Sequence, residues 1–353
     1  MADKIYGFAI VGCGAIGTFH AKQLRHVDRA RLVAVCAPRL EAAQRLAEQF
    51  HCKAYASLEA MLQDEAIDIV NICTPSSLHG EQAIACAKAK KHVITEKPMD
   101  ITLEKANLMI EAFRSSGTRL SVISQHRLDG SVSKVKRLID NGMFGNLVMG
   151  NGAVNWYRSQ TYYDSSNWRG TWQGDGGGAL MNQGIHAVDV LQYLMGPVKS
   201  VFAYCETLGH ERIEVEDAAA AVLKFANGAI GTIVGTTAAF PGLSTRIEIF
   251  GTKGSAVIED DILVYCQYQK PGSDNPEQLI NESEHANDQA GKGAANPMTI
   301  DGQSHVMQFN DMIQAIEEQR EPLVNGMEGR KPLEVITAIY QSNQSGGVIE
   351  LHM

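Results

Sequence analysis

The stretch from residue 5 to residue 17 constrains this chain more than any other, because an apolar run leads directly into three closely spaced glycines. The run at residues 8–11 predicts a buried strand, and residues 18–24 predict a helix. Between them lies a G-x-G-x-x-G pattern, formed by Gly12, Gly14 and Gly17. Between a strand and a helix, this pattern indicates a dinucleotide-binding turn, although an ordinary glycine-rich turn is the alternative.

Each glycine has an expected task in such a turn. Gly12 permits the tight turn, Gly14 lets the backbone approach a pyrophosphate, and Gly17 allows the helix to pack closely on the strand. The N–H groups at the helix N-terminus attract phosphate. The cofactor contacts that we predict in this segment are Gly12, Gly14, Ala15, Ile16 and Gly17.

The bulk properties narrow the class of protein. A length of 353 residues predicts two domains, and 44% hydrophobic with 20% charged residues is typical of a globular protein. The net charge of −9, without a basic stretch, argues against nucleic acid as a partner. Seven scattered cysteines without a C-x-x-C pair indicate reduced thiols. With no cleavable signal and no membrane-spanning run, we expect a cytoplasmic protein that acts on a small molecule.

Residues 1–124 alternate strand and helix signals, which predicts an α/β fold with a doubly wound parallel sheet, the Rossmann arrangement. After the first strand, the expected strands are residues 31–36, 67–73, 92–95 and 119–124, and the expected helices are residues 40–50, 78–91 and 102–116. Ligands bind at the carboxyl ends of strands in such sheets. The residues that follow each strand are therefore the candidates for function.

Residues 125–353 follow a different pattern, which predicts a second domain of the α+β class. Its expected strands are residues 147–157, 198–205, 216–225, 229–239, 245–250 and 255–258, and its expected helices are residues 132–141, 179–195, 304–319 and 329–343. Short connections predict an open, mainly antiparallel sheet with helices on one face. The polar segment 269–302 is compatible with a mobile loop or with an arm ordered by a partner.

The tip of the second strand bears on cofactor choice. NAD-preferring sites usually place an acidic residue there, whereas this chain has Ala37-Pro38-Arg39. Without a carboxylate, nothing at this position repels a 2′-phosphate, and Arg39 could pair with it. Arg39 could equally stack on the adenine of NAD. We therefore predict an NAD(P) cofactor with a slight lean to NADP, contacted by Ala37 and Arg39.

Glu96-Lys97-Pro98 ends another strand, so Lys97 is expected to face the ligand cleft. Most lysines are simply solvated charges. A lysine that exchanges protons in catalysis needs a pKa well below its usual range, and a nearby nicotinamide cation could lower it. We predict that Lys97 handles a proton and that Glu96 and Lys97 both line the cofactor site.

A glycine run, Gly176-Gly177-Gly178, precedes the helix at residues 179–195 and is expected to let backbone approach a ligand. Asn182 and His186 are four residues apart on one helical face. A lone histidine is more often structural, but this pair resembles a general base, His186, with an orienting neighbour, Asn182. No ligand spacing typical of a metal site occurs, so we predict no metal.

Aromatic and polar residues alternate in the loop ahead of that helix. Tyr157, Trp168 and Arg169 are the candidates here, because aromatic faces with interspersed polar groups suit sugar rings. A packed loop or a subunit contact explains the composition equally well.

Taken in this order and spacing, the glycine pattern, Glu96-Lys97-Pro98 and the Gly-Gly-Gly…Gly-x-His186 segment resemble the Gfo/Idh/MocA family of oxidoreductases over nearly the whole chain. The resemblance implies that Lys97 lies near the nicotinamide and the reacting carbinol, and that His186 exchanges the hydroxyl proton. It also implies that Thr74, Pro75 and His79 lie beside the cofactor, and that Gln125 and Arg127 lie at its nicotinamide end, where Arg127 is a candidate substrate contact. It further implies a homodimer or homotetramer formed through the C-terminal sheet.

Asn182 departs from the inositol-dehydrogenase-like members, which carry Asp there. An amide can orient an imidazole but cannot stabilise an imidazolium by charge, so more of the proton transfer would fall to Lys97. By the same resemblance, Asn in place of Asp suits members that act on pyranosides or nucleotide sugars, so free inositol is not the first expectation. The leading hypothesis is an NAD(P)-dependent dehydrogenase that acts on a secondary ring hydroxyl of a sugar, glycoside or cyclitol. The alternatives are an oxidation–elimination glycosidase, a non-enzymatic sensor of cofactor or sugar, and a biliverdin- or dihydrodiol-type reductase.

Overall fold

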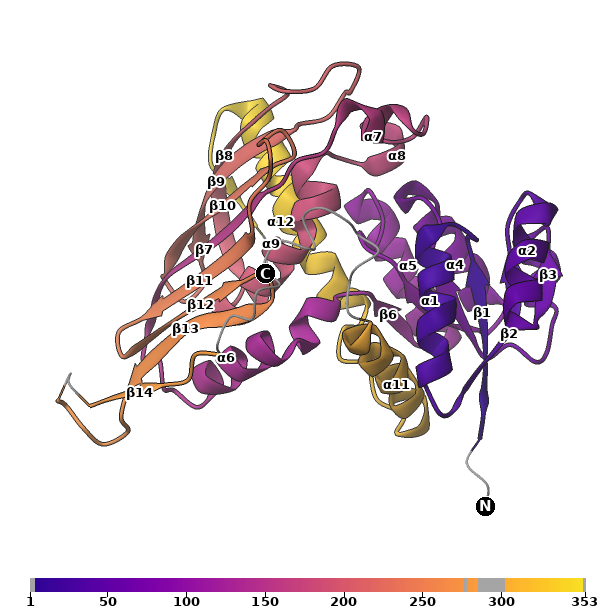
Figure 1. The fold of residues 1–353 in the computed structure, drawn as a ribbon, viewed down its shortest axis with the longest axis horizontal. Helices are drawn as coiled ribbons and strands as arrows, with labels where there is room; N and C mark the ends of the chain where they lie inside the picture. The colour runs from indigo at the N-terminus through magenta and orange to yellow at the C-terminus, as the bar shows by residue number, and fades with distance from the viewer. Residues whose placement is uncertain (1–3, 276–277, 285–301, 352–353) are drawn as a thin grey trace. The chain divides into compact units, whose positions relative to one another are not determined.

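The computed structural model describes residues 4–275, 278–284 and 302–351, which form two compact units (Figure 1). The first unit contains the chain up to Gln125 and takes up the chain again for the segment that ends at Leu333. The second unit begins at His126 and also includes the C-terminal residues from Glu334. The sequence places one boundary at residue 124 and assigns everything after it to a single C-terminal domain, so the return of the chain to the first unit was not foreseen.

The first unit is built on a six-stranded parallel sheet, as predicted. The strand order is β3-β2-β1-β4-β5-β6, with β1 (Tyr6–Val11), β2 (Ala30–Cys36), β3 (Lys53–Tyr55), β4 (Ile69–Ile72), β5 (His92–Thr95) and β6 (Leu120–Val122). Every residue of β1 and β4 is buried, which is typical of strands covered on both faces. The short β3 carries too little apolar pattern to have been predicted.

Helices connect these strands, which gives the doubly wound arrangement. They are α1 (Ala15–Gln23), η1 (Leu24–His26), α2 (Leu40–Phe50), α3 (Leu58–Leu62), η2 (Ser76–Leu78), α4 (His79–Lys88) and α5 (Leu103–Ser116). Side chains of Ser57 and Thr102 cap α3 and α5 by accepting backbone N–H groups of the first turn. Gly117, in the left-handed region at φ +73°, ends α5.

A helix from late in the chain completes the core of the first unit. α11 (Gln303–Glu317) contacts α1, as its ochre ribbon beside α1 shows (Figure 1). Its buried Phe309, Met312 and Ile313 join the cluster that contains Phe8 of β1, and the rings of Phe8 and Phe309 are 6.2 Å apart. The apolar face of α11 is therefore part of the cofactor-binding unit.

The second unit is built on a nine-stranded sheet in the order β14-β13-β12-β11-β7-β10-β9-β8-β15. Its strands are β7 (Leu147–Asn155), β8 (Val198–Glu206), β9 (Ala218–Phe225), β10 (Ile230–Thr236), β11 (Thr245–Gly251), β12 (Gly254–Glu259), β13 (Ile262–Gln269), β14 (Leu279–Asn281) and β15 (Ile349–Glu350). Only β7 and β10 pair in parallel among these strands. This confirms the predicted mixed, mainly antiparallel sheet.

The helical elements of the second unit are η3 (Gln125–Leu128, which starts at the unit boundary), α6 (Gly130–Asp140), α7 (Gln160–Asp164), α8 (Trp172–Asp175), η4 (Ala179–Gly184), α9 (Ile185–Met195) and the later part of α12 (Gly326–Ser345). α9 packs on β7, where Gly150 makes room for it, since a Cβ there would meet the side chain of Met195. Burial on β9 alternates along the strand, so one face of the sheet is covered and the other is exposed.

The polar segment 269–302 was left undecided from sequence. Part of it, β14, pairs antiparallel with β13. Residues 276–277 and 285–301 lie outside the described residues. No helix in the described part of the chain combines the length and apolar character that crossing a membrane would require.

Candidate functional site

The residues predicted to carry function fall into two groups, one in each unit. The first group lies at the carboxyl ends of the parallel strands. The second lies on η4, on α9 and in the loop before them. We describe each group by itself.

The glycine turn of the first unit has the features that a diphosphate needs. Gly12 adopts φ +101°, and a Cβ there would lie 2.5 Å from the carbonyl oxygen of Cys73. Gly14 is the N-cap of α1, and no side chain among the described residues caps it. Apart from its chain neighbours, no atom of those residues lies within 4 Å of the place where its Cβ would be. The N–H groups of Ala15, Ile16 and Gly17 begin that helix, so open space and unopposed helix donors occur together.

The tip of the second strand presents no acidic residue. Ala37 is buried directly after β2, and Arg39 is exposed at the N-cap of α2. An exposed guanidinium at this place suits either a 2′-phosphate or an adenine face. The lean to NADP therefore stays a prediction.

His79 ties together two of the loops that follow the strands. Its Nε2 lies 2.9 Å from the carbonyl oxygen of Thr74, and its Nδ1 lies 2.8 Å from the carbonyl oxygen of Pro98. The Thr74 hydroxyl donates to Gln82 at 2.7 Å. The segment with Thr74 and Pro75 is thereby fixed against the turn that carries Lys97. A contact of these residues with the cofactor remains a prediction.

Lys97 is half-buried in a turn held by backbone contacts. The Glu96 N–H donates to the carbonyl oxygen of Ile72 on β4 at 2.9 Å. The Lys97 N–H donates to Glu96 Oε2 at 3.2 Å, and the Lys97–Pro98 peptide bond is cis. The main chain at Lys97 therefore has a defined place at the end of β5.

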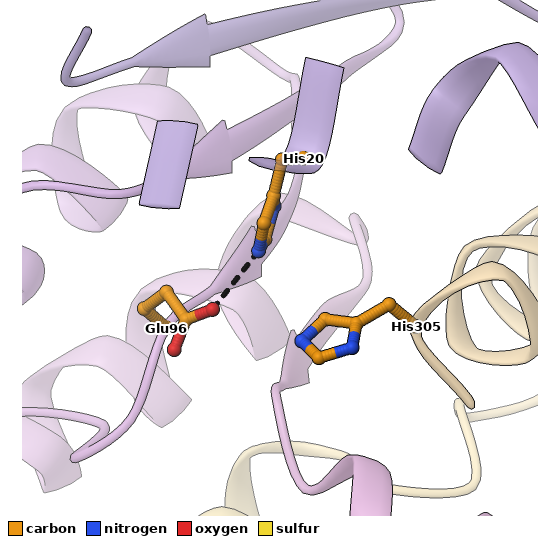
Figure 2. A group of neighbouring side chains, drawn as sticks. All are labelled: His20, Glu96 and His305. Carbon is orange, nitrogen blue, oxygen red and sulfur yellow. Dashed lines mark hydrogen bonds and ion pairs between the residues drawn. The ribbon is translucent and has the colours of Figure 1, made fainter. Parts of the chain in front are cut away.

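A buried cluster that the sequence did not reveal lies beside this turn (Figure 2). His20 of α1, Glu96 and His305 of α11 offer donor atoms within 4.8 Å of one another. Asn71 Nδ2 donates to His20 Nδ1 at 3.1 Å, so Nε2 is the protonated nitrogen that donates to Glu96 Oε1 at 2.9 Å. The only signal in the sequence was a polar residue, His20, on the buried face of α1.

The Glu96 carboxyl is charged although it is buried. Burial raises its pKa, but the His20 hydrogen bond and the charges of His305 and Lys97 outweigh burial and lower the pKa to about 2. The side chain of Glu96 thus turns inward to His20, and a contact of Glu96 with the cofactor stays a prediction.

Gln125 ends the first group. Its side chain is buried, and Oε1 has no hydrogen-bond partner among the described residues. A buried amide oxygen without a donor is costly, and an amide or hydroxyl of a bound molecule would satisfy it.

In the second unit, Asn182 and His186 lie on successive helical elements. Asn182 is in η4, a π-helical stretch, and His186 is in the first turn of α9. Single π-helical turns occur frequently at functional sites. The predicted helix at residues 179–195 is thus present, but its first six residues are wound more widely than an α-helix.

The glycine run before η4 serves internal packing, which corrects the expectation that it approaches a ligand. A Cβ on Gly177 would collide with the Tyr340 hydroxyl, and a Cβ on Gly178 would collide with the backbone of Glu216. The buried Glu216 carboxyl accepts the N–H groups of Gly178 and Leu180 at 2.7 and 2.9 Å, and the Tyr340 hydroxyl at 2.9 Å. Burial raises the pKa of Glu216 to about 7, although the hydrogen bonds from these donors lower it.

Asp175, which the sequence did not single out, orients Asn182. Asn182 Nδ2 donates to Asp175 Oδ1 at 2.8 Å, and the N–H of Gly170 donates to Asp175 Oδ2 at 2.7 Å. Asp175 is buried in α8. Asp175 therefore links the loop that contains Trp168 and Arg169 to η4, which carries Asn182. It also fixes the orientation of the Asn182 amide, whose Nδ2 group points to Asp175 and whose oxygen points away from it.

A second unforeseen cluster lies against His186. The rings of His126 and His186 are 4.8 Å apart and nearly perpendicular, at 79°. His126 Nδ1 lies 2.7 Å from Asp129 Oδ2 and 3.0 Å from Asp261 Oδ1. Burial lowers the pKa of His126, but Asp261 and Asp129 raise it to about 10, so this imidazole is charged at neutral pH.

Arg127 has an internal partner. Its Nε and Nη2 donate to the two oxygens of Asp189 at 2.9 and 2.6 Å, and its guanidinium lies 4.9 Å from the ring of Tyr193. All of these contacts are within the second unit. They brace α9 from the segment before α6. A substrate contact by Arg127 stays a prediction.

In the loop ahead of η4, arginine guanidinium groups pack against aromatic rings. Arg169 lies 4.4 Å from the ring of Tyr162 and 5.1 Å from that of Trp168. Tyr157 packs edge-on against the exposed Phe240, with ring centres 5.2 Å apart. These contacts are compatible with a sugar platform and with a packed loop, the two alternatives that the sequence left open.

Two groups of His and carboxylate donors occur among the described residues, the one at His20 and the one at His126. In each, an imidazole N–H is already directed at a carboxylate. The absence of a metal remains a prediction from the sequence.

Both units of the chain are similar to known proteins. A family model described as an oxidoreductase family with an NAD-binding Rossmann fold matches residues 6–124, and a model of the GFO/IDH/MocA C-terminal domain matches residues 132–257. The myo-inositol 2-dehydrogenase of Thermotoga maritima is 33% identical over 69% of this chain and 72% of its own length. Other curated relatives include dehydrogenases that act on inositols and on a glucoside.

Solved structures match over almost the full length. The WlbA dehydrogenase of Bordetella pertussis, in complex with NADH and UDP-GlcNAcA, has a TM-score of 0.86 and is 35% identical over 99% of this chain and 100% of its own. A levoglucosan dehydrogenase with NADH and levoglucosan has a TM-score of 0.87 over 99% and 100% of the two chains. At 23% identity, this second likeness shows the fold alone.

Proposed function

The chain belongs to the Gfo/Idh/MocA family of oxidoreductases, and from this premise we propose that it is a nicotinamide-dependent dehydrogenase of a sugar. The proposed reaction removes hydride from a carbon that bears a secondary ring hydroxyl and leaves a ketone. The preferred substrate class is a nucleotide-activated sugar. The observation that carries this choice is the 35% identity, over the full length of both chains, to a dehydrogenase solved with NADH and UDP-GlcNAcA.

The residues of the first unit fit a dinucleotide. The space in front of Gly14 and the uncapped start of α1 suit the diphosphate. The buried Oε1 of Gln125 would accept a hydrogen bond from the carboxamide of a nicotinamide. When bound, the cofactor supplies the hydride acceptor. The family model describes an NAD-binding fold, whereas a preference for NADP depends on Arg39.

The proton balance assigns tasks to three side chains. As the carbinol carbon gives up hydride, its hydroxyl must lose a proton, so that one C–H and one O–H bond break while a C=O bond forms. We assign this proton to Lys97 or His186, each of which can exchange one at neutral pH when suitably placed. Asn182, oriented by Asp175, would hold the hydroxyl or the imidazole in line.

The open face of the second sheet is the proposed contact with a second copy of the chain. Large apolar side chains are exposed on neighbouring strands there, with Tyr204 of β8 67% exposed and Val222 of β9 56% exposed. Apolar surface of this kind is typical of an interface. Light scattering coupled to gel filtration should give a dimer or tetramer, and Val222→Glu should lower the mass to that of a monomer.

The function is tested by following absorbance at 340 nm with UDP-sugars, free sugars, glycosides and inositols, each with NAD and with NADP. We expect reduction of the cofactor with at least one UDP-sugar, and no reduction by Lys97→Ala. Turnover with inositols alone would refute the substrate class. Release of an aglycone without net reduction would replace the dehydrogenase by an eliminase, and tight sugar binding without turnover by any pair would replace it by a sensor.

A further inference from the structure

We propose that His20 is a positioning residue for Lys97, and that it acts by holding the Glu96 side chain inward. This inference rests on the proposed dehydrogenase function, because it concerns the lysine to which that function assigns a proton. His20 contacts Glu96, the residue before Lys97. Its effect passes through Glu96 to the peptide N–H of Lys97.

The contacts form a continuous buried chain from β4 to Lys97. Asn71 Nδ2 donates to His20 Nδ1 at 3.1 Å, His20 Nε2 donates to Glu96 Oε1 at 2.9 Å, and Glu96 Oε2 accepts the Lys97 N–H at 3.2 Å. Asn71 and His20 are fully buried and Glu96 is 7% exposed. The first two bonds therefore form away from water, where a lost partner is not replaced by solvent, and the third lies in a partly buried turn.

The His20 ring is fixed by its surroundings as well as by its bonds. It packs against Phe309 and His305 of α11, with ring centres 5.3 and 5.7 Å away, as Figure 2 shows for His305. His20 belongs to α1, the helix that starts at Gly14. The same rigid helix thus offers its N-terminus to the expected diphosphate and its side chain to the residue before Lys97.

The turn is held from its other side by His79, whose Nδ1 lies 2.8 Å from the Pro98 carbonyl oxygen. Lys97 therefore lies between two residues that are each fixed by a buried imidazole. The His20 contact differs from the His79 contact because its acceptor is a charged carboxylate and not a backbone carbonyl oxygen. Without its donor, the Glu96 carboxylate would be buried with too few partners.

The direction of the effect follows from the titratable groups that face Glu96. These are His20 from α1, His305 from α11, the adjacent Lys97 and the Cys73 thiol from the loop after β4. When His20 is removed, the groups that still lower the pKa of Glu96 are His305 and the Lys97 ammonium, of which the ammonium is on the longer and more flexible side chain. A carboxylate that turns to this ammonium favours its charged form, and a charged lysine cannot accept a proton.

The first test measures turnover and cofactor binding. His20→Phe keeps a ring of similar size and removes both hydrogen bonds, so we expect kcat to fall 10- to 100-fold while the Kd for NADH changes less than threefold. The control is His92→Phe, at the opposite end of β5, which removes one partly buried contact, that of His92 Nδ1 with the Arg119 N–H. It should lower the melting temperature without a comparable loss of kcat. Equal losses of kcat in the two variants, or a parallel loss of NADH affinity in His20→Phe, would overturn the proposal.

The second test needs no activity, so it separates this inference from the proposed function. The rate at which an amine-directed reagent labels Lys97 in the cofactor-free protein is followed by mass spectrometry at pH 8. We expect about tenfold slower labelling in His20→Phe, which corresponds to a pKa higher by about one unit. Labelling should be faster than wild type in Glu96→Gln and unchanged in His92→Phe. Wild-type labelling in His20→Phe would refute the proposal.

A milder variant covers the case in which His20→Phe does not fold. Asn71→Leu leaves the His20–Glu96 bond and removes only the donor to His20 Nδ1, so the ring is less firmly held. We expect labelling of Lys97 about threefold slower than wild type, in the same direction. Labelling at the wild-type rate in a folded Asn71→Leu protein would count against the chain of contacts.

Discussion

The two units hold their candidate residues by different means. In the first unit, Lys97 and the glycine turn are placed by backbone at the ends of parallel strands, with buried imidazoles fixing the turns. In the second unit, Asn182 and His186 are held mainly by other side chains, with Asp175 on the amide and His126 on the ring.

This difference explains which contacts a sequence can reveal. A strand end is fixed by local chemistry, so a motif such as Glu96-Lys97-Pro98 carries its own position. A side-chain clamp joins residues that are far apart in the chain, as Asp261 and His126 are, and no local pattern marks it. In the first unit, the changes outside the motif that matter should therefore be mainly those at the two imidazoles that fix its turn, His20 and His79. In the second unit, the candidate residues should respond to changes at several remote partners.

The largest effect is expected at Lys97. Lys97→Ala should lower kcat about 1000-fold, because a positioned acid or base contributes roughly 10²–10⁴ to the rate. Lys97→Arg keeps the charge but cannot release a proton near neutrality, so it should be equally slow and should lose the basic limb of the pH–rate profile. The Kd for NADH, measured by fluorescence, should stay within a few-fold. An active Lys97→Arg protein would remove Lys97 from the proton path.

A smaller loss is expected at the residue assigned to the same proton in the second unit. His186→Asn should lower kcat about 100-fold, since Lys97 would still be present to exchange the proton. The measurement is steady-state kinetics with the best substrate of the screen. If His186→Asn and Lys97→Ala each cost the same as the double variant, the two residues act as one unit.

The clamp on Asn182 tests the contrast directly. Asp175→Ala removes the acceptor of the Asn182 amide and of the Gly170 N–H, so we expect a 10- to 30-fold fall in kcat and a lower melting temperature. Asp164→Ala, which removes an exposed ion pair with Arg212 at the end of α7, is the matched control. It should change kcat less than twofold. Equal behaviour of the two variants would mean that Asp175 only stabilises the loop.

The pH dependence of stability reports on His126. Its pKa is raised to about 10 in the folded protein by Asp261 and Asp129, although burial opposes this. A raised imidazole pKa stabilises the fold fully below the pKa of the unfolded state, near 6.5, and the contribution is lost as pH rises through 10. Because Asp261 is exposed and screened by solvent, we expect about 1 kcal/mol.

The measurement compares wild type with His126→Asn by urea unfolding at pH 6 and pH 10.5. The difference in unfolding free energy between the two proteins should be larger at pH 6. A difference that grows with pH would show that His126 is neutral in the folded state. For Asp261→Asn, the change in unfolding free energy between pH 6 and pH 10.5 should lie between that of wild type and that of His126→Asn.

The smallest effect concerns cofactor choice. Arg39→Ala should lower kcat/KM for NADP about fivefold and leave the value for NAD within twofold, since an exposed arginine contact with a phosphate is worth little more than 1 kcal/mol. Steady-state kinetics with both cofactors decides this. A fall of the same size with NAD would favour stacking of Arg39 on the adenine.

Much of the fold could be predicted because it depends on local periodicity. The strands that precede Gly12, Thr74 and Glu96 were each marked by an apolar run, and both sheet types followed from connection lengths. The strands β13 and β14 were not identified: β13 begins with an apolar run that was assigned to no element, and β14 is only three residues long. The α12 helix was expected, but the membership of α11 in the first unit depends on contacts of Phe309 that only the folded chain shows.

The candidate site was predicted to the extent that motifs carry it. Lys97, Asn182 and His186 were identified from spacing, whereas His20, Asp175 and His126 were not, because their significance comes from partners 76, 7 and 135 positions away. The glycine run before Asn182 was assigned to ligand approach, but its cause is the close passage of Glu216. A glycine in the sequence indicates that another group lies close to the backbone, but it does not identify that group.

α11 belongs to the first unit although it lies about three hundred residues along the sequence, and this has a consequence for synthesis of the chain on the ribosome. Phe309, Met312 and Ile313 complete the core that Phe8 begins, so about three hundred residues are translated before the first unit can bury all its apolar surface. The N-terminal segment must wait in an incomplete state while the second unit is made. A gene fragment that stops after β6 should yield an aggregation-prone product, and coexpression with the α11 peptide should rescue it.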